Sequence, residues 1–317
     1  MHSGGGETNV ETHLRQCGDR YEIVLTSGIY VASRCAQAVR THAPRAALVF
    51  DTIDVHFLRE YREAKVTRNL NRIRNALRVR AIELSVARNA DLTLVVSDRE
   101  KELLEEESPE IRAFVLPNIH EVTLPGAPFE ERRDLYYLGA YTFQPNIDAV
   151  VNFVREVLPA VRLRLPGVRF YVAGADPTDE VRGLESEGAI VTGYIPDLAT
   201  FFDCRRVCVV PLRYGAGIKG KVLLSMAHGV PVVTSPVGAE GIPARDGLDL
   251  MIAREAGDWP ILIERVYHDR ALWCTLSRNG MDLVERNYSF RAVSARVDAL
   301  LGEMESRIDR QTRAVHG

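Results

Sequence analysis

Short apolar stretches rich in β-branched residues alternate with longer amphipathic stretches along the second half of the chain. The short stretches predict strands over 135–139, 168–174, 189–194, 207–212, 231–235 and 250–253. The longer ones predict helices over 147–165, 179–186, 198–204 and 222–229, followed by helices over 258–268, 270–287 and 290–310. Because strands and helices alternate, we expect a parallel, doubly wound sheet.

The first part of the chain shows the same alternation. Four strands are predicted, over 21–26, 46–50, 91–96 and 111–116, with helices over 10–17 and 31–42 and another after the capping box Ser97-Asp-Arg-Glu100. Residues 57–90 predict one long helix or two, in which Val66, Leu70, Ile73, Leu77 and Ala81 form an apolar stripe facing the core. The fold class is therefore α/β, with two Rossmann-like domains.

Prolines, glycines and polar residues mark the connection between the two halves. Val115-Leu-Pro-Asn118 ends the last strand of the first half, and Pro125, Gly126 and Pro128 follow it. We predict an N-terminal domain over 1–120, a linker over 121–134, a second domain over 135–288 and a terminal helix over 289–317. A chain of 317 residues is long enough for two such domains.

The composition is that of a globular protein, with 46% hydrophobic and 26% charged residues. A net charge of −3 argues against nucleic acid as a partner. No apolar run is long enough to cross a membrane, and residues 1–7 lack the apolar core of a signal peptide, so a cytoplasmic location is expected. The five cysteines are scattered without metal-binding spacing, which favours buried free thiols.

The loop after the strand at 207–212 carries the densest chemical signal. Three glycines fall within six residues: Gly215, Gly217 and Gly220. Glycines let backbone amides approach a ligand closely, and a helix follows that ends at Gly229. The N-terminus of that helix, with Lys219 and Lys221 beside it, is suited to phosphate. The order of residues matches neither a Walker loop nor the dinucleotide fingerprint.

This segment resembles a motif of the GT-B glycosyltransferases of the group 1, or family 4, type. The motif is GxGxKxKvLEAMAxGxPVV, and the chain reads Gly215-Ala-Gly-Ile-Lys-Gly-Lys-Val-Leu-Leu-Ser-Met-Ala-His-Gly-Val-Pro-Val-Val233. Further segments resemble the same family: Gly139-Ala-Tyr-Thr-Phe-Gln-Pro-Asn146, Gly193-Tyr-Ile-Pro-Asp197 and Asn287-Tyr-Ser-Phe290. The resemblance implies two domains facing a cleft and a final helix that crosses back onto the first domain.

The same resemblance implies a nucleotide-sugar donor whose diphosphate is bound by residues of the second domain. The donor-binding candidates are Gly215, Gly217, Lys219, Lys221 and Gly139. Two family glutamates are replaced: Leu224 stands where one of them grips the donor ribose, and the other falls on Ala216. Many relatives also carry an arginine and a lysine after the strand at 135–139, where this chain has Gln144-Pro-Asn146.

The N-terminal domain is expected to be shortened. Its four strands are fewer than the family has, and the family's first strand and glycine loop are not recognisable. Gly4-Gly-Gly6 has no strand before it and does not replace that loop. We therefore expect an open sheet edge, which a partner chain could cover.

Polar residues follow the strand at 46–50, where α/β proteins bind ligands. We interpret Asp51 as the cap of a turn. Asp54 either caps the next helix or, with Arg59, lies on the acceptor side. His56 either packs against its neighbours or orients the acceptor hydroxyl or the transferred sugar, which makes it a catalytic candidate.

The second catalytic candidate is Glu240, in the loop Gly238-Ala-Glu-Gly241. It would contact the donor sugar or ribose, the alternative being a solvated loop carboxylate. The resemblance implies sugar transfer to a hydroxyl of a glycan, a lipid-linked or another acceptor, with retention and without metal or cofactor, in bacterial surface glycan synthesis. The alternative function is a non-catalytic GT-B module that acts as a partner or scaffold in a glycan-assembly complex.

Residues 59–80 are strongly basic, with Glu60 and Glu63 as the only acids. The cations are Arg59, Arg62, Lys65, Arg68, Arg72, Arg74, Arg78 and Arg80. A basic amphipathic helix could lie on the inner face of an anionic membrane or bind a phosphorylated acceptor. A solvated face over a buried stripe is the alternative that we favour.

Overall fold

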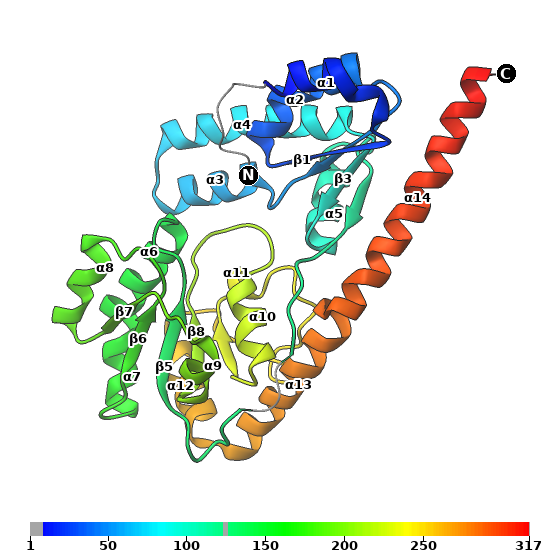
Figure 1. Ribbon diagram of the computed structural model, residues 1–317. Helices are drawn as coiled ribbons and strands as arrows, with labels where there is room; N and C mark the ends of the chain where they lie inside the picture. Colours follow the sequence, from blue (N-terminus) through cyan, green and yellow to red (C-terminus); the bar gives the residue numbers. More distant parts are fainter. Residues whose placement is uncertain (1–8, 123–125, 317) are drawn as a thin grey trace. The chain divides into compact units, whose positions relative to one another are not determined.

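The computed structural model describes residues 9–122 and 126–316, and its internal contacts divide the chain into two compact units (Figure 1). The first unit runs to Pro117 and includes the chain from Ser294 onward, and the second is Asn118–Val293. Each unit is an α/β structure built on one parallel sheet, which confirms the predicted fold class. Residues 4–6, and residues 123–125 of the predicted linker, lie outside the described residues.

The first unit has a four-stranded sheet with the order β1-β2-β3-β4. The four predicted strands are confirmed as β1 (Ile23–Ser27), β2 (Ala47–Asp51), β3 (Leu92–Val95) and β4 (Ala113–Val115). The helices are α1 (Val10–Cys17), α2 (Ile29–His42), α3 (His56–Val66), α4 (Leu70–Asn89) and α5 (Asp98–Glu107), with a 3-10 turn at Gly18–Arg20.

One face of this sheet is covered by the last helix, α14 (Phe290–His316). Met304 packs with Ala47 and Val49 of β2 and with Leu92 and Leu94 of β3. β1 and β4 are the two edge strands, and Leu25 of β1 is 58% exposed. The coverage of an open edge by a partner chain stays a prediction.

The stripe predicted for residues 57–90 is wrong over α4. A turn at residues 67–69 separates α3 from α4, and the Asn69 side chain accepts hydrogen bonds from the first amides of α4. The buried residues of α4 are Ala76, Val79, Glu83, Leu84, Val86 and Ala87. Leu70 and Leu77, by contrast, are 73% and 55% exposed. The helix has apolar side chains on two sides, and the side that carries Ala76, Val79 and Glu83 packs inward.

The second unit has a six-stranded parallel sheet with the order β10-β9-β8-β5-β6-β7. The six predicted strands are confirmed as β5 (Arg133–Leu138), β6 (Phe170–Ala173), β7 (Ile190–Gly193), β8 (Arg205–Val210), β9 (Val232–Thr234) and β10 (Met251–Ile252). Counted within the unit, this is the order 3-2-1-4-5-6 reversed end to end, which is the strand order of the dinucleotide-binding Rossmann fold.

Helices cover both faces of this sheet. They are α6 (Gln144–Asn152), α7 (Leu158–Arg164), α8 (Asp179–Gly183), α9 (Leu198–Asp203), α10 (Gly220–Ala227), α11 (Pro236–Ala239), α12 (Asp258–His268) and α13 (Arg270–Tyr288), with a 3-10 turn at Leu184–Glu187. The helix predicted over 147–165 is interrupted by a π-helical turn at Phe153–Val157. The interruption lies just before Pro159, which has no N–H to donate to a preceding turn.

Aromatic contacts form much of the packing in the second unit. Phe153 packs against Phe170 of β6 and Trp259 of α12, with ring centroids 4.8 and 6.0 Å away. Tyr136 of β5 packs against Phe201 and Phe202 of α9, with centroids 5.4 and 5.6 Å away. The two helical layers are thus fastened to the sheet by separate aromatic clusters.

The cysteines are free, but their expected burial holds for Cys208 and not for Cys204 and Cys274, which are exposed. Cys208 lies in the central strand β8, whereas Cys204 follows a surface helix and Cys274 lies on the outer side of α13. No helix in the described part of the chain is long and apolar enough to cross a membrane.

The connection after Pro117 packs with the second unit, and Arg132 is its anchor. Arg132 is 1% exposed, and its guanidinium donates to the carbonyl oxygens of Ala127, at 2.6 Å, and Phe202, at 2.9 Å. It also lies over the Trp273 ring, 5.5 Å from the centroid. A buried charge needs such partners, so Arg132 fixes the path by which the connection enters β5. The predicted domain boundaries remain predictions.

We expect Arg132→Met to lower the free energy of unfolding of the second unit by ~2–4 kcal/mol, because it leaves buried carbonyl oxygens unpaired. Both tryptophans, Trp259 and Trp273, lie in this unit, so urea denaturation followed by tryptophan fluorescence reports on it. Arg270→Met, which removes an exposed ion pair with Glu130, is the control, with an expected change below about 0.5 kcal/mol. Equal effects of the two variants would contradict this account.

Candidate functional site

The order of the second sheet places a topological switch point between β5 and β8. From β5 the sheet continues to β6 and β7, and from β8 it continues to β9 and β10. The loops after these two strands, residues 139–143 and 211–219, lead into α6 and α10. Open α/β sheets bind ligands outside the carboxyl ends of their strands at such a point, so these loops are the candidate site.

The loop after β8 has a backbone that glycine permits. Gly217 has φ +67° and Gly215 has φ +154°. A Cβ atom at Gly215 would lie 3.2 Å from Cε of Lys219, so a larger residue would press against that side chain. The Lys219 ammonium is buried and donates to the carbonyl oxygens of Ala216, at 3.1 Å, and Gly217, at 2.5 Å. Lys219 therefore holds the shape of the loop, and Ala216 supplies an acceptor for it.

Lys221 joins three elements at the switch point. Its ammonium donates to the Tyr137 hydroxyl, at 2.5 Å, and to Oδ1 of Asn146, at 2.6 Å. The Tyr137 hydroxyl donates to the same oxygen, at 2.6 Å. Burial, with a contribution from the charge of Lys219, lowers the pKa of Lys221 to about 7. A single side chain on α10 is thus tied to β5 and to the first turn of α6.

Gly139 lies at the same point. A Cβ atom there would be 2.9 Å from atoms of both Tyr137 and Asn146, so only glycine fits. The Asn146 amide group donates to the carbonyl oxygen of Ala140, at 2.7 Å, and so fixes the loop after β5. Gly139 and Lys221, predicted together from the sequence, are brought together here, with Tyr137 and Asn146 between them.

Tyr137, Asn146 and His120 were not among the residues singled out by the sequence. Asn146 had a signal, because Pro145-Asn146 opens a helix directly after a strand. His120 had none: it follows the Pro117-Asn118 turn, and its ring lies 3.6 to 3.7 Å from the position of a Cβ on Gly220, at the start of α10. Its backbone amide donates to the Tyr288 carbonyl oxygen, at 2.8 Å, and burial lowers the pKa of its imidazole.

Glu240 follows α11, next to the glycine loop. Val237 of α11 lies 4.0 Å from the position of a Cβ on Gly215, and the Ser235 hydroxyl caps α11 by accepting from the Gly238 amide at 3.1 Å. Glu240 is half-buried at the end of this segment. Leu224, where the family has a glutamate, is partly buried and packs against the hydrophobic core.

In the first unit, the turn after β2 brings the acceptor-side candidates together. Oδ1 of Asp54 lies 3.0 Å from Nδ1 of His56, and Arg59 forms an ion pair with the other carboxylate oxygen of Asp54. The neighbouring Asp54 carboxylate raises the pKa of His56. Burial acts to raise the pKa of Asp54, but the neighbouring His56 and Arg59 outweigh it and lower that pKa.

The helix after this turn is capped by Glu83 and not by Asp54, so the capping interpretation of Asp54 is wrong. The fully buried Glu83 carboxylate accepts from the amides of His56, at 3.0 Å, and Phe57, at 2.9 Å. Burial raises the pKa of Glu83 to about 7. Asp51 does cap its turn, since its Oδ1 accepts from the Ile53 amide at 3.1 Å.

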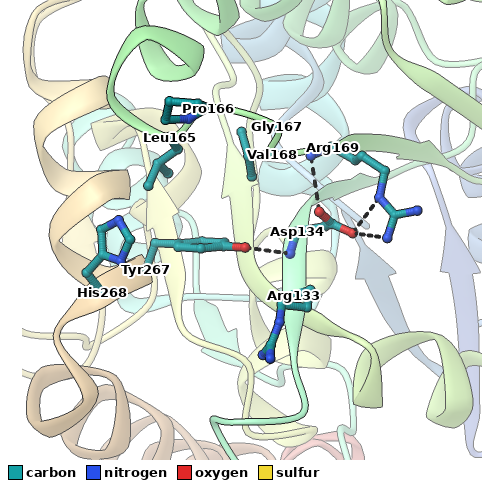
Figure 2. A pocket seen from close by; sticks show the side chains of 9 residues that line it. All are labelled: Arg133, Asp134, Leu165, Pro166, Gly167, Val168, Arg169, Tyr267 and His268. Atoms are coloured by element: carbon teal, nitrogen blue, oxygen red, sulfur yellow. Dashed lines mark hydrogen bonds and ion pairs between the residues drawn. The ribbon is translucent and has the colours of Figure 1, made fainter.

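A hollow of about 430 Å³ lies at the amino ends of β5 and β6 (Figure 2). Its charged groups already have protein partners: the Asp134 carboxylate accepts from Nε of Arg169 at 2.9 Å, and the Asp134 amide donates to the Tyr267 hydroxyl at 3.3 Å. Figure 2 shows these contacts across the hollow. Because the hollow is at the sheet edge opposite the switch point and its ion pair is closed, it is not our candidate site.

Comparison with known proteins places this geometry in a class. Residues 132–269 match the family model described as "Glycosyl transferases group 1". No curated protein sequence matches the chain significantly. Residues 132–269 are thus a group 1 glycosyltransferase domain.

Solved structures share the fold of nearly the whole chain. Sucrose-phosphate synthase from Thermosynechococcus elongatus is similar with a TM-score of 0.74 and 19% identity, over 94% of this chain and 77% of that one. HepE from Anabaena, in complex with UDP, has a TM-score of 0.73 and 14% identity, over 93% and 82%. TarM, of S. aureus, has a TM-score of 0.72 and 11% identity, over 93% and 57%.

The chain spans little more than half the length of TarM and about four fifths of HepE. Its fold is that of the GT-B glycosyltransferases among these structures, and the match to the group 1 family model covers residues 132–269. The expected glycosyltransferase class is confirmed, and the roles of individual site residues stay predictions.

We expect the binding of a nucleoside diphosphate at the switch point, with UDP as the probe, to take up a proton at pH 8. Lys221 has a pKa of about 7 in the free protein, and a bound diphosphate favours its charged form, so its pKa rises on binding. The affinity then falls by up to about tenfold per pH unit above pH 7. Calorimetry at pH 8, in buffers that differ in ionisation enthalpy, measures the uptake, because the UDP phosphates are then fully ionised.

Lys221→Met is the control, because it removes the titrating group and keeps most of the side-chain volume. Binding without proton uptake by the natural chain, or the same uptake by this variant, would contradict the assignment of the proton to Lys221.

Proposed function

We propose that the chain transfers a sugar from a nucleoside diphosphate donor to a hydroxyl acceptor, with retention and without a metal ion. The observation that supports this most directly is the position of Lys221 at the switch point, where α6 and α10 both begin. Two helix N-termini and an ammonium group favour negative charge at one place. Such a site stabilises the charge that develops on a leaving diphosphate.

The amides of Gly215 and Gly217 add donors to this site, and Lys219 contributes by holding the loop in which they lie. Charge stabilisation by these groups takes the part that a metal ion has in other transferases, which supports the metal-independent proposal. The HepE structures contain UDP, UDP with glucose, and UDP-glucose. UDP-sugars are therefore the donors to test first.

We assign the acceptor side to the first unit. Oδ1 of Asp54 lies 3.0 Å from Nδ1 of His56, so we assign Nε2 of the ring to orient an acceptor hydroxyl or the transferred sugar. Arg59, paired with the same carboxylate, completes this group. Glu240 is assigned to the donor sugar or ribose. We further propose that the acceptor is a glycan or a lipid-linked molecule. The transfer then serves bacterial surface glycan synthesis, in the cytoplasm.

A non-catalytic partner of a glycan-assembly complex is the second candidate. It is motivated by Leu224, which packs on the core where the family has a ribose-binding glutamate. It is also motivated by Ala216 at the position of the other family glutamate. Donor binding distinguishes the two candidates, because a scaffold has no need of the diphosphate site.

We expect one of UDP-, GDP-, dTDP- or ADP-sugars to bind, and Lys221→Ala to weaken that binding by about 10- to 100-fold, as expected for loss of a hydrogen bond from a charged group. Isothermal titration calorimetry measures both. Lys101→Ala is the matched control, since Lys101 is an exposed lysine of α5 that pairs with Glu105. If no donor binds to the natural chain, the enzyme proposal fails and the scaffold candidate stands.

We expect His56→Ala to slow sugar transfer by about 100-fold or more without weakening donor binding, because His56 is assigned to the acceptor side. Transfer from the donor identified above, assayed with and without acceptor, measures this. Asp54→Asn removes the neighbouring carboxylate that raises the pKa of His56, so the His56-dependent limb of the pH–rate profile moves to lower pH. An unchanged rate for His56→Ala would refute the assignment.

A further inference from the structure

The outward face of α4 combines exposed leucines with arginines. Leu70 and Leu77 are 73% and 55% exposed, and they are two helical turns apart. Arg74 and Arg78 are exposed between and beside them, and the exposed Ala81 continues the same stripe. Residues spaced by three, four and seven lie on one side of a helix, so these five side chains form a single surface. We call it the α4 face.

The α4 face carries positive charge without compensating acids. Glu83 is the only acid of α4, and it is buried on the opposite side of the helix. Arg72 and Arg80 are paired with Glu63 and Glu107. In the described part of the chain, by contrast, Arg74 and Arg78 form no ion pair, and their charge is directed to solvent. The basic character of residues 59–80 is thus partly neutralised within the fold, and the remainder is concentrated on the α4 face.

A shallow hollow of about 460 Å³ continues the α4 face toward α2. Its lining includes Arg78, Ala81, Ile82 and Ser85 of α4 and Ser33 and Gln37 of α2. No acidic side chain lines it. The surface is therefore wider than one helix, and it keeps the same mixture of apolar and basic side chains.

We propose that the α4 face binds the surface of an anionic membrane, with Arg74 and Arg78 at the lipid phosphates and Leu70 and Leu77 among the acyl chains. Arginines alone would suit any polyanion, but two exposed leucines in the same stripe gain free energy only from an apolar partner. Basic residues at a negatively charged leaflet add to that attraction. The helix lies on the membrane and does not cross it, in keeping with the absence of a spanning helix in the described residues.

Vesicle sedimentation tests this proposal without any donor or acceptor. The natural chain is mixed with vesicles of phosphatidylcholine alone, or of phosphatidylcholine and phosphatidylglycerol in equal parts. We expect sedimentation with the second kind only. The double variant Arg74→Glu, Arg78→Glu is expected to bind at least about 30-fold more weakly, which corresponds to the removal of two basic residues from the lipid surface.

The double variant Leu70→Ser, Leu77→Ser tests the apolar part, and it is expected to lose most of the binding that resists high salt, because salt screens the arginines and not the leucines. Leu163→Ser and Arg278→Glu are the matched controls on the second unit, where Leu163 is 85% exposed and Arg278 is exposed. Both controls should bind as the natural chain does. Circular dichroism and thermal unfolding show whether each variant is folded.

Three results would overturn the proposal. The first is that the natural chain fails to sediment with the phosphatidylglycerol vesicles. The second is that the arginine variant is folded and binds as well as the natural chain. In the third, the arginine variant loses binding but the leucine variant keeps all of it, which would make the α4 face a general anion-binding surface. Donor binding is measured separately, so failure here leaves the proposed transfer reaction untouched.

Discussion

The hydrogen bonds from the half-buried Lys221 ammonium to the Tyr137 hydroxyl and the Asn146 side chain are the interactions on which the second unit's site depends. A buried cation without a carboxylate beside it is costly, and its lowered pKa expresses that cost. The same contacts hold the start of α10 against β5 and the start of α6, so both helix N-termini are fixed at the switch point. A bound diphosphate would supply the negative charge that this arrangement lacks.

The glycine loop before α10 is also ordered by a charged side chain. Lys219 is close in sequence to Lys221 but has another task, because it donates to carbonyl oxygens of its own loop. The glycines there adopt backbone angles that this loop requires, and Gly139 leaves room for Tyr137 and Asn146. Two lysines that are two residues apart thus have different roles. Lys219 holds the conformation of the loop, and Lys221 places positive charge at the site.

The first unit uses buried carboxylates in a comparable way. Glu83 of α4 binds the first amides of α3, and Glu100 of α5 binds the amides of Val55 and Val96, each at 3.2 Å. These contacts fix the turn after β2 from two directions and leave Asp54 available to pair with His56 and Arg59. Glu83 also explains why the side of α4 with Ala76 and Val79 faces inward, since the carboxylate that caps α3 has to lie on the packed side.

The sequence alone determined the strands, most helices, the two-domain α/β class and the glycine loop, because these follow from local periodicity and from residues adjacent in the chain. It also singled out Lys221 and Gly139, which the structure brings together. It did not identify Tyr137 and Asn146 as partners of Lys221, which lie 84 and 75 residues away in the chain. It also assigned Leu70 and Leu77 to the core, because α4 has two apolar sides and periodicity does not say which one packs. Only the tertiary structure decided these two points. Packing against the rest of the first unit selects which side of α4 is buried, and the folding of the sheet brings Tyr137 and Asn146 to Lys221.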